Sequence, residues 1–298
     1  MAILPVALRK PITVALLLSL MAVHSLLALG WRASYLPGSA MALALGGGGA
    51  AHPYNIALTM ANPVHVWGLD GEALEVGHLR MFGDLKGYNL RWHRTVKDRP
   101  LQLVLHSMVE DEIELRSDIP TAQPLGYFSA RLMTASIIRG WQLGGIRIGV
   151  NLTGAYQRIF EYSAWGTWMS AGIQGEPLPW MRWGLTVSNL GFATVLNVES
   201  ESVIPRLGAA LAVKTPLQSS YLSLDLWGDE YRGFVPAISW RGSGSVLGLT
   251  AGVRWEKDTP LITAGIDISY HQWTIAYAYG YQETTLGQPH LLSLGRNL

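Results

Sequence analysis

The sequence contains no cysteine. Disulfide bridges, thiolate metal sites and thiol nucleophiles are therefore excluded together. Charged residues are also scarce, at 14% of the chain, whereas ordinary soluble domains carry about 25%. The formal net charge is only +1, so no basic field predicts binding to nucleic acid. These absences point away from an ordinary soluble enzyme and from a nucleic-acid-binding protein.

Familiar catalytic and metal-binding patterns are missing as well. The histidines form no His-x-x-x-His or His-x-His pair of the kind that ligates zinc, and no Gly-x-Ser-x-Gly nucleophile elbow occurs. The run Gly46, Gly47, Gly48, Gly49 lacks the lysine of a phosphate-binding loop, so it predicts tight packing instead. The acidic residues from Glu110 to Glu114 are interpreted as a solvated loop between strands rather than a calcium site. The sequence predicts no enzymatic activity, no metal and no cofactor.

Residues 1–30 resemble a secretory signal peptide. Arg9 and Lys10 form a short basic head, and an apolar run from Val14 to Leu29 follows it. That run is shorter than the roughly 20 residues that a membrane-spanning helix needs, which disfavours an uncleaved anchor. Cleavage is plausible after Gly30 or after Ala44. The first site is favoured because it ends the apolar run.

Glycine, tryptophan and tyrosine are abundant, at 33, 12 and 12 residues, and the second half of the chain alternates apolar and polar side chains. Successive residues of a β-strand point to opposite faces of the sheet, so a period of two predicts a two-faced strand. A strand that crosses a bilayer at a tilt needs about nine to eleven residues. Three runs between Val246 and Gln282 meet this length, and their apolar faces are Leu247, Leu249, Ala251, Val253, Trp255; Ile262, Ala264, Ile266, Ile268, Tyr270; and Trp273, Ile275, Tyr277, Tyr279, Tyr281.

About fourteen strand-like runs follow one another after Glu72, separated by turn residues. They are predicted at 72–78, 88–95, 100–109, 127–138, 142–155, 164–174, 180–190, 206–214, 219–228, 235–241, 246–256, 260–270, 272–282 and 290–298. A secreted β-sandwich would also alternate, with its apolar faces buried between two sheets. Long strands, the signal peptide and aromatic residues near the strand ends favour a membrane barrel. The expected aromatic girdle comprises Trp165, Trp180, Trp183, Trp227, Trp255, Tyr270 and Trp273.

The predicted fold class is therefore all-β, a transmembrane antiparallel β-barrel of about fourteen strands. Residues 31–71 are predicted to form an N-terminal plug-like segment that includes the Asn62-Pro63 turn, and residues 72–298 the barrel. An arginine on the lipid face near the midplane costs about 2–4 kcal/mol, so polar strand residues should face the lumen. They either pair with each other and fill the lumen or line a route for a ligand. The candidates are Arg147, Asn151, Arg182, Asp225, Arg254 and Asp267.

Several short motifs resemble the PorV/PorQ family of outer-membrane proteins, which are relatives of the FadL-type fatty-acid transporters. They are the Ala/Gly-rich piece from Gly38 to Ala50, the Asn62-Pro63 pair, Asn189-Leu190-Gly191, and the closing stretch from His290 to Leu294. The resemblance implies a fourteen-stranded barrel with an N-terminal plug-like segment. It also implies that residues 31–44 stay in the mature protein.

Two functions are compatible with this resemblance. The first is passive transport of hydrophobic or amphipathic small molecules in the manner of FadL. The alternative is a non-catalytic scaffold or adaptor in protein secretion or surface attachment. Both imply the bacterial outer membrane and contact with its lipids. The expected partners are a hydrophobic ligand in the first case, and envelope or secretion proteins in the second.

Overall fold

The structure is a computed structural model that describes Trp31 and residues 36–117, 122–196, 203–217, 219–230, 232–256, 259–284 and 287–298. The predicted signal peptide, residues 1–30, lies outside the described residues and stays a prediction. Among the residues described, no helix is both long and apolar enough to cross a membrane.

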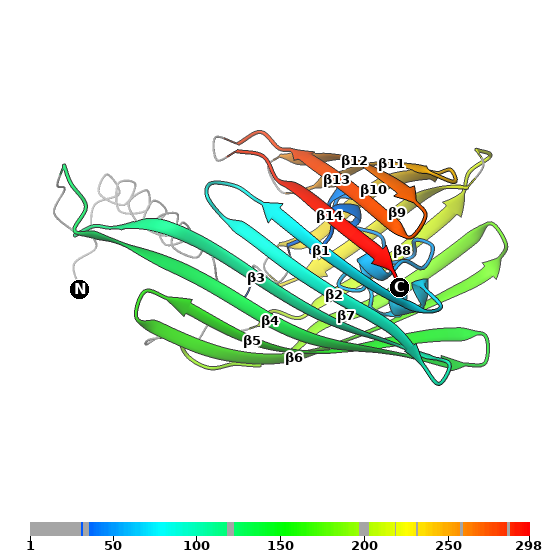
Figure 1. The fold of residues 1–298 in the computed structure, drawn as a ribbon, viewed down its shortest axis with the longest axis horizontal. Helices are drawn as coiled ribbons and strands as arrows, with labels where there is room; N and C mark the ends of the chain where they lie inside the picture. The colour runs from blue at the N-terminus through cyan, green and yellow to red at the C-terminus, as the bar shows by residue number, and fades with distance from the viewer. Residues whose placement is uncertain are drawn as a thin grey trace, which may run out of the picture.

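Fourteen antiparallel strands in the described part of the chain close into a barrel (Figure 1). Each strand pairs with its neighbours in sequence, and β1 pairs with β14, so the barrel leaves no open sheet edge. The strands are β1 (Glu72–Arg80), β2 (Lys86–Val96), β3 (Arg99–Leu115), β4 (Gly126–Leu143), β5 (Ile146–Ile159), β6 (Tyr162–Leu178), β7 (Met181–Ala193), β8 (Arg206–Lys214), β9 (Ser220–Asp229), β10 (Gly233–Ser243), β11 (Leu247–Trp255), β12 (Pro260–Tyr270), β13 (Trp273–Tyr281) and β14 (His290–Asn297). The predicted fold class is confirmed.

The alternating side chains take the two faces of the wall. On β12, Ile262, Ile266 and Ile268 are exposed on the outer face, while Thr263 is buried on the inner face. The other strands of the barrel repeat the pattern, with exposed leucine, isoleucine and tyrosine on the outside. An apolar outer surface around a closed sheet suits hydrocarbon, because every backbone group of the sheet finds its partner within the barrel.

Several predicted strand boundaries were wrong, and two of the differences have a clear local cause. The acidic residues after Val109 belong to β3, which continues to Leu115, rather than to a loop. A β-bulge between Glu110 and Ile113, with Glu112 at a φ of 59°, absorbs the extra residues and lets pairing with β4 resume. The β4–β5 hairpin turns at Gly144, whose φ is 60°, and not before residue 142.

The two ends of the barrel differ in the length of their connections. At the end where β1 begins and β14 ends, which we call the turn end, four of the six connections are two-residue turns and the longest is 215–219. The opposite, loop end carries the longer connections 116–125, 194–205 and 282–289. Strands β3 to β6 extend beyond the other strands at the loop end (Figure 1).

Residues 36–71, which we call the inner segment, lie inside the barrel. The short helix α2 (Ala40–Ala44) contacts β11 to β14, whereas the 3-10 helix η4 (Pro63–Gly68) contacts β3 to β6 on the opposite side of the wall. Between them, η3 (Ile56–Leu58) packs against both helices. The segment therefore spans the lumen, as the blue ribbon in Figure 1 shows.

Candidate functional site in the lumen

The four-glycine run ends α2 and joins the inner segment to the wall. Gly46 and Gly47 adopt positive φ values, and Gly47 N–H donates to the carbonyl of Ala42 at 2.8 Å, which closes the helix C-terminus. The next amides, those of Gly49 and Ala50, both donate to one carboxylate oxygen of Asp225 on β9, each at 2.8 Å. The run thus binds an anionic group, and that group belongs to the protein itself.

Asp225 is 1% exposed, so these two charge-assisted hydrogen bonds are shielded from water. Trp227, two residues further on β9, packs against Ala50 and lies under the guanidinium of Arg206, 4.0 Å from its ring centroid. Trp227 therefore faces the lumen, and its prediction as a girdle residue was wrong. The odd-numbered positions of β9 point inwards, so Trp227 shares the face of Asp225.

Asn62 connects two parts of the inner segment, the start of η4 and the backbone at Ala50. Its side-chain oxygen caps η4 by accepting from Val64 N–H at 3.2 Å, and its amide nitrogen donates to the carbonyl of Ala50 at 2.9 Å. Pro63 occupies the first turn of η4, where its missing N–H costs nothing. The residue pair predicted as a turn is therefore a helix start.

His65 ties together the two halves of the inner segment. Its Nδ1 accepts from Asn55 N–H at 3.3 Å, and its Nε2 lies 2.7 Å from the carbonyl of Gly49, so Nε2 carries the proton. Burial lowers the pKa of His65 to about 4. The pKa of His52 is lowered to about 3, chiefly by burial and then by the charge of Arg241. Both rings are neutral at pH 7.

Glycines on the barrel wall make room for the start of η4 in the inner segment. A side chain at Gly149 on β5 would overlap the carbonyl group of Pro63, and one at its paired residue Gly172 on β6 would overlap the side chain of Asn62. The glycines allow a close approach of backbone to wall that any larger residue prevents. Part of the high glycine content is explained in this way.

The remaining lumen candidates also face inwards, and two of them, Arg147 and Arg182, stack on aromatic rings of the inner segment. Arg147 lies over the rings of Tyr54 and Trp67, and Arg182 lies over Tyr54 and pairs with Glu176 at 2.9 Å. Desolvation raises the pKa of Tyr54. These stacked guanidiniums hold the middle of the inner segment against β5 and β7.

Two further candidates lie in local polar clusters. Arg254 donates to the carbonyl of Gly46 at 3.2 Å and pairs with Glu256 at 2.7 Å. Asn151 accepts from Thr153 at 3.4 Å on the inner face of β5. Arg254 thus contacts the inner segment, whereas the contact of Asn151 lies within its own strand.

The inner face is not uniformly polar, although the sequence predicted a lumen lined by paired polar residues. At the loop end the buried inner side chains form an apolar cluster that includes Leu79, Met108, Leu132, Trp168 and Leu291. Trp31 packs edge-to-face on Trp168, with 6.0 Å between ring centroids. Alternation assigns a residue to a face but does not make that face polar, and for this reason the sequence did not reveal the cluster.

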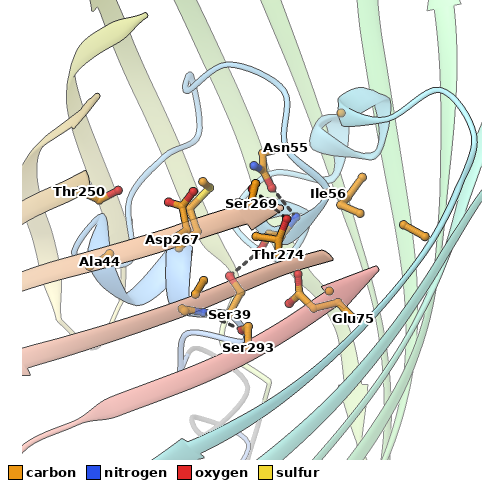
Figure 2. Close-up of a pocket in the computed structure, with 18 of the residues that line it drawn as sticks. Ser39, Ala44, Asn55, Ile56, Glu75, Thr250, Asp267, Ser269, Thr274 and Ser293 are labelled. Atoms are coloured by element: carbon orange, nitrogen blue, oxygen red, sulfur yellow. Dashed lines mark hydrogen bonds between the residues drawn. The ribbon is translucent and has the colours of Figure 1, made fainter. Parts of the chain in front are cut away.

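A cavity of about 250 Å³ lies at the turn end. Figure 2 shows Asp267 and Ser269 of β12, Thr274 of β13 and Ser39 and Asn55 of the inner segment around it. Ala44 and Ile56 add apolar atoms to the lining. A second cavity of about 180 Å³ at the loop end is lined by Leu43 and Phe82 among others. Because Ala44 lines the first cavity and Leu43 the second, α2 lies between the two.

Asp267 receives a bidentate ion pair from Arg241 on β10, with oxygen–nitrogen distances of 2.6 and 3.2 Å. Arg241 also donates to Thr250 at 3.0 Å. Arg241 was not among the lumen residues predicted from the sequence. Arg241 lies two residues after Ser239 on β10, so the alternation of strand residues places both side chains on the inner face.

No group of three or more histidine, cysteine, aspartate or glutamate side chains that could hold a metal ion occurs among the described residues. The arrangement therefore offers apolar surface, hydroxyl and amide groups, and charges already paired within the protein. The two cavities can therefore bind a small molecule through apolar contacts and hydrogen bonds.

We expect Gly149→Val to displace η4 from the wall, because the new side chain would occupy the position of Pro63. Increased protease cleavage within the inner segment, measured on the folded barrel, is the expected result. The matched control is Gly154→Val on the same strand, where an added side chain meets no atom within 4 Å. Equal cleavage of the two variants would contradict the packing described here.

The closed sheet, the apolar outer face and the internal segment define an outer-membrane β-barrel, and its location is the bacterial outer membrane. The sequence matches no family model and no curated protein.

Among solved structures, the Pseudomonas putida toluene transporter TodX matches with a TM-score of 0.66 at 11% identity, over 86% of this chain and 96% of that one. The CymD monoaromatic hydrocarbon channel matches with a TM-score of 0.62 at 12% identity, over 87% and 97%. A Pseudomonas aeruginosa FadL homologue matches with a TM-score of 0.57 at 9% identity, over 86% and 97%. At these identities the likeness shows the fold. It supports the FadL-type part of the predicted resemblance, whereas nothing found supports PorV/PorQ membership or a role in secretion.

Proposed function

We propose that the protein is a passive channel for small hydrophobic or amphipathic molecules across the outer membrane. The observation that carries this proposal is the division of the lumen. An apolar inner face at the loop end is followed by the inner segment and then by a mixed polar and apolar cavity at the turn end. The solved structures of similar fold include channels for toluene and for monoaromatic hydrocarbons.

Outer-membrane barrels have short periplasmic turns and longer extracellular loops. By this rule the loop end faces the exterior and the turn end faces the periplasm. An apolar molecule would then leave water at the loop-end cavity, beside Leu43 and Phe82, gaining about 25 cal/mol for each Å² of apolar surface that it buries. It would continue to the turn-end cavity when the inner segment shifts.

The inner segment is the part of this route that must move. Its hydrogen bonds to Asp225, its stacking on Arg147 and Arg182, and its approach to Gly149 and Gly172 hold it in the lumen. Of the six predicted lumen residues, Asp267 lines the turn-end cavity and Arg254 the loop-end cavity. We propose that Arg147, Arg182 and Asp225 position the inner segment, and that Asp267 and Arg254 face the ligand. On this reading the inner segment acts as the plug.

Retention of the inner segment also bears on the signal peptide. Cleavage after Ala44 would remove α2 and its contacts with β11 to β14. We therefore propose that cleavage follows Gly30 and that the mature chain begins at Trp31. The intact mass of the protein extracted from outer membranes distinguishes the two sites.

Uptake of radiolabelled toluene tests the proposed function. Bacterial cells with an intact outer membrane that produce the barrel should take up toluene several times faster at low concentration than cells producing none. The Gly149→Val barrel, in which we expect η4 to be displaced from the wall, should take up toluene faster than the wild-type barrel. Equal uptake with and without the folded barrel would refute the proposal. No feature of the described residues favours the adaptor function.

A further inference from the structure

The charges that face the turn-end cavity compensate each other. Its inward-facing charged side chains are Glu75, Arg241 and Asp267. Glu75 pairs with the buried Arg91, and Arg241 pairs with Asp267. Arg296 also borders the cavity, but its guanidinium lies over the ring of Trp273, 5.1 Å from the centroid, and both side chains are exposed. An anionic ligand would therefore find no unpaired cation among the described inward-facing groups of this cavity.

The Arg241–Asp267 pair is built into the sheet. The two residues lie on strands separated by β11, so the carboxylate must cross that strand to reach the guanidinium. Gly248 on β11 stands directly opposite Asp267 in the register, and a side chain added there would lie 2.5 Å from both carboxylate oxygens. A glycine at this position gives the carboxylate its path across β11. Both terminal nitrogens of Arg241 are directed to Asp267 as a result.

Neutral hydrogen-bonding groups remain for a ligand. Ser269 and Thr274 lie 3.0 Å apart and share one hydrogen bond between their hydroxyl groups, which leaves a second hydroxyl hydrogen. The two residues and the apolar atoms of Ala44 and Ile56 line the same space. The cavity thus provides for a molecule with an apolar body and an uncharged polar group.

We propose that the Arg241–Asp267 pair makes the turn-end cavity selective for neutral amphipathic molecules, such as small alcohols and phenols, over carboxylates. This inference rests on the proposed channel function. A carboxylate entering the cavity loses its hydration, and its best compensation is a bidentate bond to a guanidinium. Asp267 already occupies that position and also repels a second anion. An alcohol needs only the hydroxyl groups of the lining.

Binding of benzyl alcohol and benzoate to the purified full-length barrel at pH 7 tests the inference, because the two probes share a ring and differ in charge. We expect the wild type to bind benzyl alcohol at least about tenfold more tightly. Asp267→Asn should raise benzoate affinity about tenfold, as expected for one hydrogen bond to a charged group. The double variant Arg241→Gln/Asp267→Asn is the matched control. It removes the charge of both partners, and benzoate affinity should stay low.

Gly248→Ala is a second, independent variant that leaves all charges in place. Displacing the carboxylate from Arg241 should shift the affinity ratio towards benzoate in the same direction. Heat-modifiable migration on a gel establishes that each variant is folded. The selectivity would be overturned if the ratio of benzoate affinity to benzyl alcohol affinity were unchanged in both folded single variants. Equal affinities of the wild type for the two probes would also overturn it. In either case, toluene uptake would still support the channel. Absence of both toluene uptake and benzyl alcohol binding would instead overturn the proposed function.

Discussion

Replacing Asp225 with alanine is expected to release the inner segment from β9 and to destabilise the protein by about 2–5 kcal/mol. The carboxylate is 1% exposed and accepts from the amides of Gly49 and Ala50 at 2.8 Å. Hydrogen bonds to charged groups contribute about 1.5–3 kcal/mol each, and two buried amides would be left without an acceptor. Equilibrium unfolding in urea, with detergent concentration held constant, measures the change. Single-channel recording should show higher conductance or more frequent opening.

Asp225→Asn is the control for this experiment. The asparagine carbonyl oxygen can take the place of the oxygen that accepts from both amides, so most of the geometry is kept while the charge is lost. We expect Asp225→Asn to lie between the wild type and Asp225→Ala in stability, with conductance close to that of the wild type. If Asp225→Ala had the same stability in urea and the same conductance as the wild type, the attachment of the inner segment to β9 would be unimportant for its position.

The second large effect concerns the lipid face. Leu224, the outer neighbour of Asp225, is 53% exposed in the middle of β9. Leu224→Arg places a charge in hydrocarbon and should cost about 2–4 kcal/mol, because no water or partner is present at that depth. The fraction of heat-modifiable, folded barrel in the outer membrane should fall strongly.

Leu217→Arg is the matched control for the lipid face. Leu217 is 63% exposed in the connection 215–219 at the turn end, where an arginine reaches water, so this change should cost about 0–1 kcal/mol. Similar losses of folded barrel in the two variants would contradict the assignment of the β9 outer face to lipid. The comparison holds the residue type constant and changes only depth.

The fold could be predicted because the alternation of apolar and polar residues along a strand shows which residues share a face. Leu222, Leu224 and Leu226 are all exposed and apolar, while Ser223 and Asp225 between them are buried. A barrel repeats this signal along every strand, so the prediction did not depend on any single motif. The acidic part of β3 was missed because the bulge at Glu112 breaks the period of two where the strand leaves the apolar band.

The contacts of the candidate site could be predicted only in part. The glycine run and Asp225 were both recognised in the sequence, but 175 positions separate Ala50 from its acceptor. The pairing of Asp267 with Arg241 was hidden for a related reason, since it crosses an intervening strand at a glycine. Sequence spacing carries no information on which distant groups meet inside a closed barrel.

The sequence by itself determined the barrel, its approximate strand count, its two faces and the inward position of its polar residues. These follow from local alternation and from the cost of a charge in lipid. Only the tertiary structure decided what fills the lumen, which charges are already paired and where the cavities lie. Closure of the barrel brings residues that are far apart in the sequence within hydrogen-bonding distance, and the resulting pairs set the chemistry of the lumen.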